Sequence, residues 1–384
     1  MHRLKIQQAF DSAWKEYAAS FCPSPVQGKA AASIMACKSG KLGVNASVCR
    51  DCGHMEVHNN SCRNRSCPCY QAILKEVWID ARRAEVIDAP YFHVVFTIPA
   101  QLNAPVYANQ ALLCSLLHRC SAQTLLELAA DRKFLGAVPG IIQVLHTWGQ
   151  QLNFHPHIHC IVSGGGLSKD RRLKVAGNHF FIPARVLAAK FKGKLLSSLD
   201  SLYRAGKLSF PDSCASLKDP ASWAVFRDAL CSATWCPDIR ETFNGFGNAI
   251  EYLGRYANRI AITNARIKAV TRDSVTFAAK DCRNNSAPIE VTLSCLEFVR
   301  RFMMHVLPPG FQKIRYYGFL NNRYRKNNLE LVFRLQGHQR FQSMLAGLPM
   351  DEVLYKVWGY NIHVCPACGC LGMRPLGRSY VPRE

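Results

Sequence analysis

Three histidines stand at alternate positions in the stretch FHPHIHCIVSGGG, residues 154 to 166. In an extended strand, residues two apart point to the same side, so His155, His157 and His159 would share one face. Imidazoles at positions i and i+2 can both reach one metal ion and leave its other side open for substrate and water. A single histidine on a strand is more often structural, but this spacing favours metal ligation by His157 and His159.

A third metal ligand must come from a neighbouring strand. The apolar run GIIQVLHTW is joined to the histidine stretch by the polar turn GQQLNF, which predicts an antiparallel hairpin. His146 in this run lies 11 residues before His157, within reach across the turn, and is our first choice. His93 and Gln150 are weaker alternatives because either can be structural. A register slip of one residue would turn His146 to the other face.

Two tyrosines follow each other at helical spacing in the segment EYLGRYANR. We expect a helix over residues 248–262, on which Tyr252 and Tyr256 lie on one face. Such a pair is usually core packing, but Arg255 and Arg259 do not suit a purely apolar face. A tyrosine hydroxyl, with a pKa near 10, becomes nucleophilic when a base or positive charge favours its phenolate. Together with a metal, these residues predict phosphoryl transfer through a covalent phosphotyrosine.

A cysteine cluster near the N-terminus, CRDCGHMEVHNNSCRNRSCPC, has the spacing of a structural zinc site. Two separated thiolate pairs at about 2.3 Å from one ion complete a tetrahedral zinc centre. The predicted ligands are Cys49, Cys52, Cys67 and Cys69, and the substitutes, since thiolate and imidazole both suit zinc, are Cys62, His54 and His58.

A second cysteine cluster, CPACGC, lies near the C-terminus. It offers only three thiols, Cys365, Cys368 and Cys370, with His363 as a possible fourth ligand. The cluster therefore forms an incomplete site of its own, has no metal, or completes or packs beside another site.

The charge balance points to a polyanionic partner. The chain of 384 residues has 48 Lys and Arg against 26 Asp and Glu, a net charge of +22 and a pI near 9.5. Nucleic acid is the first candidate. A membrane surface would require a basic segment beside an amphipathic or lipid anchor, and the sequence shows neither. With no transmembrane run and no signal-peptide core, we expect a cytoplasmic protein. In a reducing compartment, its 18 cysteines favour metal ligation over disulfides.

The surrounding elements predict an α+β protein with a mainly antiparallel sheet. The run YFHVVFTIP predicts a strand at 91–99, helices are expected at about 71–86, 108–133 and 183–206, and SVTFAAKD with IEVTLSC predicts a further hairpin. We expect three parts: an N-terminal helix and zinc-binding module at 1–75, a catalytic domain at 76–310, and a basic extension with the second cysteine cluster at 311–384.

The basic extension alternates cations with aromatic rings, as single-strand grooves do. The predicted DNA-binding residues are Lys313, Arg315, Arg323 and Arg325, together with Arg255 and Arg259 on the tyrosine segment. The alternative is an ordinary packed helix and strand with solvated charges.

These motifs together resemble the HUH endonuclease superfamily, with His157, Ile158 and His159 as its histidine–apolar–histidine motif. The order of the motifs resembles that of the insertion sequence IS91 family of rolling-circle transposases over most of the chain, from about residue 49 to residue 368. The motifs are the cysteine module, YFHVVFTIP, HTWGQ, HPHIH, YLGRY and HVLPPGFQKIRYYGFL. The family tends to read CPxCQ at the end of the zinc module, where this chain reads CPCYQ. This departure leaves the fourth zinc ligand open between Cys69 and Cys62.

The resemblance implies a ferredoxin-like antiparallel sheet with the HUH pair on a central strand. It further implies cleavage of single-stranded DNA at element ends, with joining to target DNA, through a 5′-phosphotyrosine. Tyr252 and Tyr256 would be the nucleophiles and Mg²⁺ or Mn²⁺ the working ion. Two alternatives stay open: a plasmid replication initiator or relaxase of the same superfamily, and a non-catalytic zinc-dependent DNA-binding protein.

Overall fold

The computed structural model describes most of the chain. It covers residues 5–68, 72–177, 182–235, 237–241, 254, 261–281, 286–337 and 342–379. Several residues singled out above lie outside this part of the chain: Cys69, Tyr252, Arg255, Tyr256 and Arg259.

A central antiparallel sheet carries the histidine stretch. Its strand order is β11-β4-β5-β3-β7, and β6 pairs with the far end of β5. The strands are β3 (Tyr91–Thr97), β4 (Val138–Trp148), β5 (Phe154–Leu167), β6 (Leu173–Val175), β7 (Asp238–Glu241) and β11 (Ile314–Gly318). Because β5 is hydrogen-bonded on both sides, the HUH motif lies on a central strand, as the resemblance implied. The antiparallel α+β class is confirmed.

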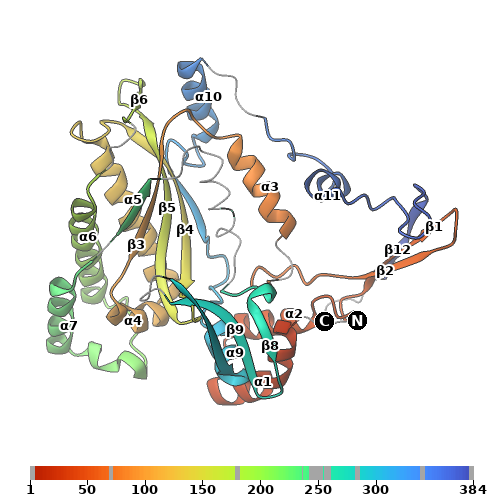
Figure 1. Ribbon diagram of the computed structural model, residues 1–384. Helices are drawn as coiled ribbons and strands as arrows, with labels where there is room; N and C mark the ends of the chain where they lie inside the picture. The colour runs from red at the N-terminus through yellow and green to blue at the C-terminus, as the bar shows by residue number, and fades with distance from the viewer. Residues whose placement is uncertain are drawn as a thin grey trace.

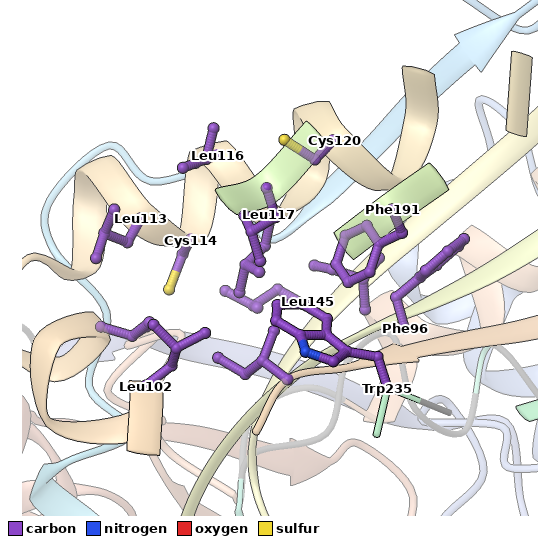
Figure 2. Close-up of a cluster of buried hydrophobic side chains, with 14 of the residues drawn as sticks. Phe96, Leu102, Leu113, Cys114, Leu116, Leu117, Cys120, Leu145, Phe191 and Trp235 are labelled. Atoms are coloured by element: carbon purple, nitrogen blue, oxygen red, sulfur yellow. The ribbon is translucent and has the colours of Figure 1, made fainter. Parts of the chain in front are cut away.

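Helices cover one face of this sheet with the largest hydrophobic core of the molecule (Figure 2). The helices are α4 (Asn103–Ala108), α5 (Gln110–Ala130), α6 (Ala184–Arg204) and α7 (Pro220–Ser232). Leu117 of α5 and Phe191 of α6 pack on Phe96 and Leu145 of the sheet, with Trp235 beside them. Burying such side chains contributes about 1.5–3 kcal/mol each, so this layer makes the sheet a rigid support.

The opposite face of the sheet is covered by α3 (Ala72–Arg83) and α10 (Arg325–Gln336) (Figure 1). Ile79 of α3 and Val332 of α10 belong to the same core cluster as Val144 of β4 and Ile161 of β5. Since side chains two apart on a strand share a face, the residues at 146, 157 and 159 also point to this side. We refer to it as the histidine face.

A second unit packs the N-terminal helices on a small meander. Helices α1 (Lys5–Phe21) and α2 (Pro25–Ala36) share a core with α9 (Cys295–Met303) and with the antiparallel strands β8 (Ile267–Val270), β9 (Ser274–Asp281) and β10 (Ala287–Ser294). Ser24 begins α2 through a capping box with Gln27, which satisfies backbone donors at that end. The predicted hairpin of SVTFAAKD and IEVTLSC is confirmed as β9 and β10.

A third sheet joins the two ends of the chain. Strand β1 (Val44–Cys49) pairs with β2 (Met55–Asn59) on one side and with β12 (Met373–Ser379) on the other, at a distance from the central sheet (Figure 1). Helix α11 (Met350–Trp358) precedes β12. Residues 311–384, predicted as one extension, therefore supply β11 to the central sheet and β12 to the cysteine module. Among the described residues, none of the helices has the length and apolar character needed to span a bilayer.

Candidate metal centres and the tyrosine segment

The β4–β5 pairing brings three histidines together on the histidine face. His146 is directly opposite His157 in the register, and His159 follows two residues on. One ring nitrogen of each histidine lies within 4.8 Å of the others. The ring centroids of His146 and His159 are 4.4 Å apart, and those of His157 and His159 are 4.9 Å apart. The predicted hairpin is confirmed, and its register places His146 on the face that the prediction required.

Hydrogen bonds fix the orientation of two of these rings. His157 Nδ1 is 2.7 Å from the backbone oxygen of His155 and donates its proton there. His159 Nδ1 is 2.9 Å from Nε2 of His93, a buried neighbour on β3. In both rings Nδ1 is engaged, so Nε2 is the nitrogen that can bind a cation. His93, a weaker candidate for a ligand, thus lies behind His159 as its hydrogen-bond partner.

Burial keeps the imidazoles of His157 and His159 neutral. Desolvation lowers the pKa of His157 to about 4 and that of His159 well below its usual value, with neighbouring histidines adding to the effect. A neutral imidazole has the lone pair that a metal ion requires. His157 and His159 therefore offer neutral nitrogens at neutral pH, and with His146 they form a group that could hold a metal ion.

A half-buried lysine lies close to this set. The Trp148 ring stacks on His146 at 4.5 Å between centroids, and Lys313 Nζ lies 4.7 Å from the centroid of the Trp148 ring. Burial lowers the pKa of Lys313 to about 7, and the lysine contributes to the lowered pKa of His159. Of the cations predicted to bind DNA, Lys313 is therefore next to the histidines.

The other predicted DNA-binding cations in the described part of the chain have different surroundings. Arg315 donates to Ser115 Oγ at 2.8 Å, and Arg325 pairs with Glu85 at 3.1 Å. These contacts hold β11 and α10 against the rest of the fold. Arg323 is exposed, with its guanidinium 5.2 Å from the centroid of the Tyr324 ring, and can meet a nucleic acid. Arg255 and Arg259 lie outside the described residues.

One residue of the tyrosine segment is described. Gly254, between the two tyrosines, is buried and helical. A Cβ atom at this position would lie 2.2 Å from Cγ1 of Ile79, so only glycine fits without moving the Ile79 side chain. Ile79 is on α3 and belongs to the core cluster on the histidine face of the sheet. The middle of the YLGRY motif thus packs on the side of the sheet that carries the three histidines.

Four cysteines from opposite ends of the chain form a closed set of ligands. Cys49 and Cys368 have their Sγ atoms 3.7 Å apart, and those of Cys52 and Cys365 are 3.6 Å apart. Four sulfurs at about 2.3 Å from one zinc ion would be about 3.8 Å from each other, so the set fits tetrahedral zinc. A closed set of four thiolates is typical of a structural site.

The two halves of this set repeat one local structure. In CRDCG the Gly53 N–H donates to the backbone oxygen of Cys49 at 3.0 Å, and in CPACG the Gly369 N–H donates to the backbone oxygen of Cys365 at 2.8 Å. The φ angle is 73° at Gly53 and 75° at Gly369. Glycine adopts this left-handed conformation without strain. The repeated CxxCG motif was the sequence signal that could have identified the partners.

The predicted zinc set of Cys49, Cys52, Cys67 and Cys69 is not the grouping that the structure shows. Cys67 lies instead with Cys37 and Cys62, where the three sulfurs are within 4.8 Å of one another. Cys69 lies outside the described residues. The substitutes are not in the four-cysteine set either: His58 pairs with Glu56. At the C-terminal cluster His363 pairs with Asp351, and within the described part of the chain neither it nor Cys370 belongs to a group that could hold an ion.

Two family models and two named relatives match the chain. Residues 140–328 match the family model described as "Putative transposase", and residues 9–98 match that described as "Transposase zinc-binding domain". The chain is 39% identical over 348 residues to "Putative transposase y4qJ" of Sinorhizobium fredii, which covers 90% of this chain and 87% of that protein. It is 30% identical over 293 residues to "Transposase for insertion sequence element IS801" of Pseudomonas savastanoi pv. phaseolicola, covering 76% and 69% respectively. No significant match to a solved structure was found.

The matched ranges correspond to the candidate sites. The first model spans the histidine triad, Gly254 and β11, and the second spans Cys37, the CRDCG knuckle and Cys67. Structural zinc is therefore supported by the family as well as by the cysteine geometry. The chain belongs to the IS91 family of transposases, enzymes that process DNA, and it carries the N-terminal zinc-binding domain of that family.

Proposed function

We propose that this transposase works by rolling-circle transposition, in which single-stranded DNA is cleaved and rejoined at the ends of an insertion sequence through tyrosine transesterification. The observation that carries the proposal is the triad of His146, His157 and His159 on the face against which Gly254 packs. A metal site and a pair of tyrosines on the same face are the two parts that such chemistry requires.

The three histidines would hold a divalent cation. Imidazole nitrogen suits Mn²⁺ better than Mg²⁺, which prefers an all-oxygen shell, so of the two expected ions the donor set favours Mn²⁺. Such an ion would supply Lewis-acid polarisation of the scissile phosphate. Three protein ligands leave positions for substrate, in contrast to the closed four-cysteine set.

Tyr252 and Tyr256 are the proposed nucleophiles. The tyrosine oxygen attacks phosphorus, the bond from phosphorus to the 3′ oxygen breaks, and the proton lost by the tyrosine is balanced by the one that the 3′ oxygen gains. The product is a 5′-phosphotyrosine and a free 3′ hydroxyl. A 3′ hydroxyl of another strand reverses the step and releases the tyrosine. Because the bond energy is kept in the phosphotyrosine, two tyrosines support two transfers without ATP.

Lys313 is placed to hold the phosphate. The Lys313 ammonium group is next to Trp148, whose ring stacks on His146. A phosphate bound at the triad would therefore be attracted electrostatically by this ammonium group. A cation in a half-buried position is screened less than one on the surface. Trp148 also offers an aromatic ring to an unstacked base, and the net charge of +22 suits a DNA partner.

The test is formation of a covalent adduct with a single-stranded oligonucleotide that carries an element end. Wild type with Mn²⁺ should yield a protein–DNA adduct that survives denaturing electrophoresis, and the double variant Tyr252→Phe with Tyr256→Phe should yield none. Tyr355→Phe, at an exposed tyrosine on α11, is the matched control and should retain the adduct. An adduct that persists in the double variant would overturn the assignment of the nucleophiles.

A second arm tests the triad. His157→Ala with His159→Ala should abolish the adduct while DNA retention at low salt continues, because the basic surface is unchanged. If nicking never occurs under any metal, the non-catalytic DNA-binding alternative is favoured. A replication initiator or relaxase shares the chemistry and would cleave an origin in preference to an element end.

A further inference from the structure

We propose that the chain binds a second structural zinc ion through Cys37, Cys62 and Cys67, separate from the ion of the four-cysteine set. This inference does not depend on the proposed function. All three side chains are buried, and their sulfur atoms lie within 4.8 Å of one another. They come from two places in the chain: Cys37 caps the end of α2, and the other two lie in the loop that follows β2.

Backbone donors point at these sulfurs. The N–H of Cys62 is 3.5 Å from Cys37 Sγ, and the N–H of Asn64 is 3.5 Å from Cys62 Sγ. Between them Arg63 has a φ of 54°, which turns the loop so that the second bond can form. Amide donors around thiolates orient them and partly balance their charge, as in the outer shell of metal sites. Three free thiols in an apolar core would need neither this convergence nor these donors.

The ligand count fits zinc. Three thiolates fill three of the four tetrahedral positions. Among the described residues no further histidine, cysteine or carboxylate joins this group. Cys69, two residues beyond Cys67, lies outside the described residues. The two cysteine groups share no member, so each ion would have its own ligands.

The second centre would fix the N-terminal module on the catalytic domain. Arg65, within the cysteine loop, donates to the backbone oxygens of Phe311 and Leu307, each at 2.8 Å, and of Pro308 at 2.5 Å. These carbonyls belong to the segment between α9 and β11. At the other end, Gln7 Nε2 donates to the backbone oxygens of Ile34, at 3.0 Å, and of Cys37. A zinc ion here would therefore link α1, α2 and the approach to β11.

The decisive measurement is the zinc content of the full-length protein. Every protein in this test carries His157→Ala with His159→Ala, so that the histidine set adds no ion. After passage over a chelating resin, elemental analysis and native mass spectrometry of this parent protein should give two zinc ions per chain. Cys365→Ser with Cys368→Ser should leave one, and Cys62→Ser with Cys67→Ser should also leave one. Cys231→Ser, at an exposed cysteine outside both groups, should keep two.

One zinc ion per chain of the parent protein would overturn the proposal, and so would two ions in the Cys62 and Cys67 variant. The count in the parent protein decides even if the Cys62 and Cys67 variant fails to fold. As a second route, Cys67→His should retain two ions, because imidazole can replace thiolate at zinc, whereas Cys67→Ser should lose one. Retention by the serine variant contradicts the assignment. Since the readout is metal content, its failure would leave the tyrosine chemistry untouched.

Discussion

Gly254→Ala tests whether Gly254 packs on α3 as the structure shows. In a helix with open surroundings, alanine in place of glycine is stabilising by about 0.5–1 kcal/mol. Here the new Cβ would lie 2.2 Å from Ile79 Cγ1, far inside the contact distance of about 3.5–4 Å between carbon atoms. Overpacking of a buried site costs about 1–3 kcal/mol. The two effects oppose each other, and we expect a net loss of about 1–2 kcal/mol in unfolding free energy.

The measurement is urea unfolding of three variants and a control. Gly193→Ala in α6 is the matched control, because a Cβ there would have no atom within 4 Å, and it should be stabilising by about 0.5–1 kcal/mol. Ile79→Ala alone should cost about 2–5 kcal/mol by cavity formation. The double variant should lose about 1–2 kcal/mol less than the sum, since Ile79→Ala removes the atoms that the new Cβ would meet.

The same variants connect packing with function. If the segment is displaced from α3, Gly254→Ala should also lower the yield of the covalent DNA adduct, and the double variant should recover part of it. A Gly254→Ala variant that is stabilised like Gly193→Ala, with no coupling to Ile79→Ala, would refute the placement of this segment on the histidine face.

Three further predictions concern the histidines and the cysteine module. His93→Ala should weaken Mn²⁺ binding by about 10- to 100-fold in calorimetry, because His159 loses the partner that orients it. His155→Ala should change the Mn²⁺ affinity little. An unchanged Kd for His93→Ala would contradict the orienting role. Cys365→Ser with Cys368→Ser should make residues 359–379 sensitive to protease without affecting the central sheet, and unaltered protection would show that zinc does not hold β12 in place. Burial lowers the pKa of His305 to about 4. Because the unfolded state takes up a proton at this histidine near pH 6.5 and the folded state only near pH 4, the free energy of unfolding decreases as pH falls from about 6.5 towards 4. His305→Gln should remove roughly 2–3 kcal/mol of that pH dependence in urea unfolding, whereas parallel profiles for variant and wild type would reject it.

Local patterns of the sequence were sufficient for several features of the sites. The alternation of two residues per repeat placed His157 and His159 on one face of a strand, whatever the rest of the fold. The short polar turn made β4 and β5 neighbours, so His146 could be named as their partner. The spacing of CRDCG likewise predicted a metal-binding knuckle. These features depend on residues close in sequence, whose geometry the backbone itself sets.

The tertiary structure decided which distant parts meet. The knuckles CRDCG and CPACG share the CxxCG motif, which marks them as candidates for one site, but the motif alone does not bring them together in space. Cys52 meets Cys365, 313 residues away, because β1 pairs with β12. With Cys365 and Cys368 as the partners of Cys49 and Cys52, Cys67 lies in a different group, with Cys37 and Cys62. His93 became the partner of His159 because β3 lies beside β5 in the sheet. Strand pairing between remote segments is selected by the packing of the whole fold, so the sequence determined the individual ligands, and only the tertiary structure decided which of them share a site.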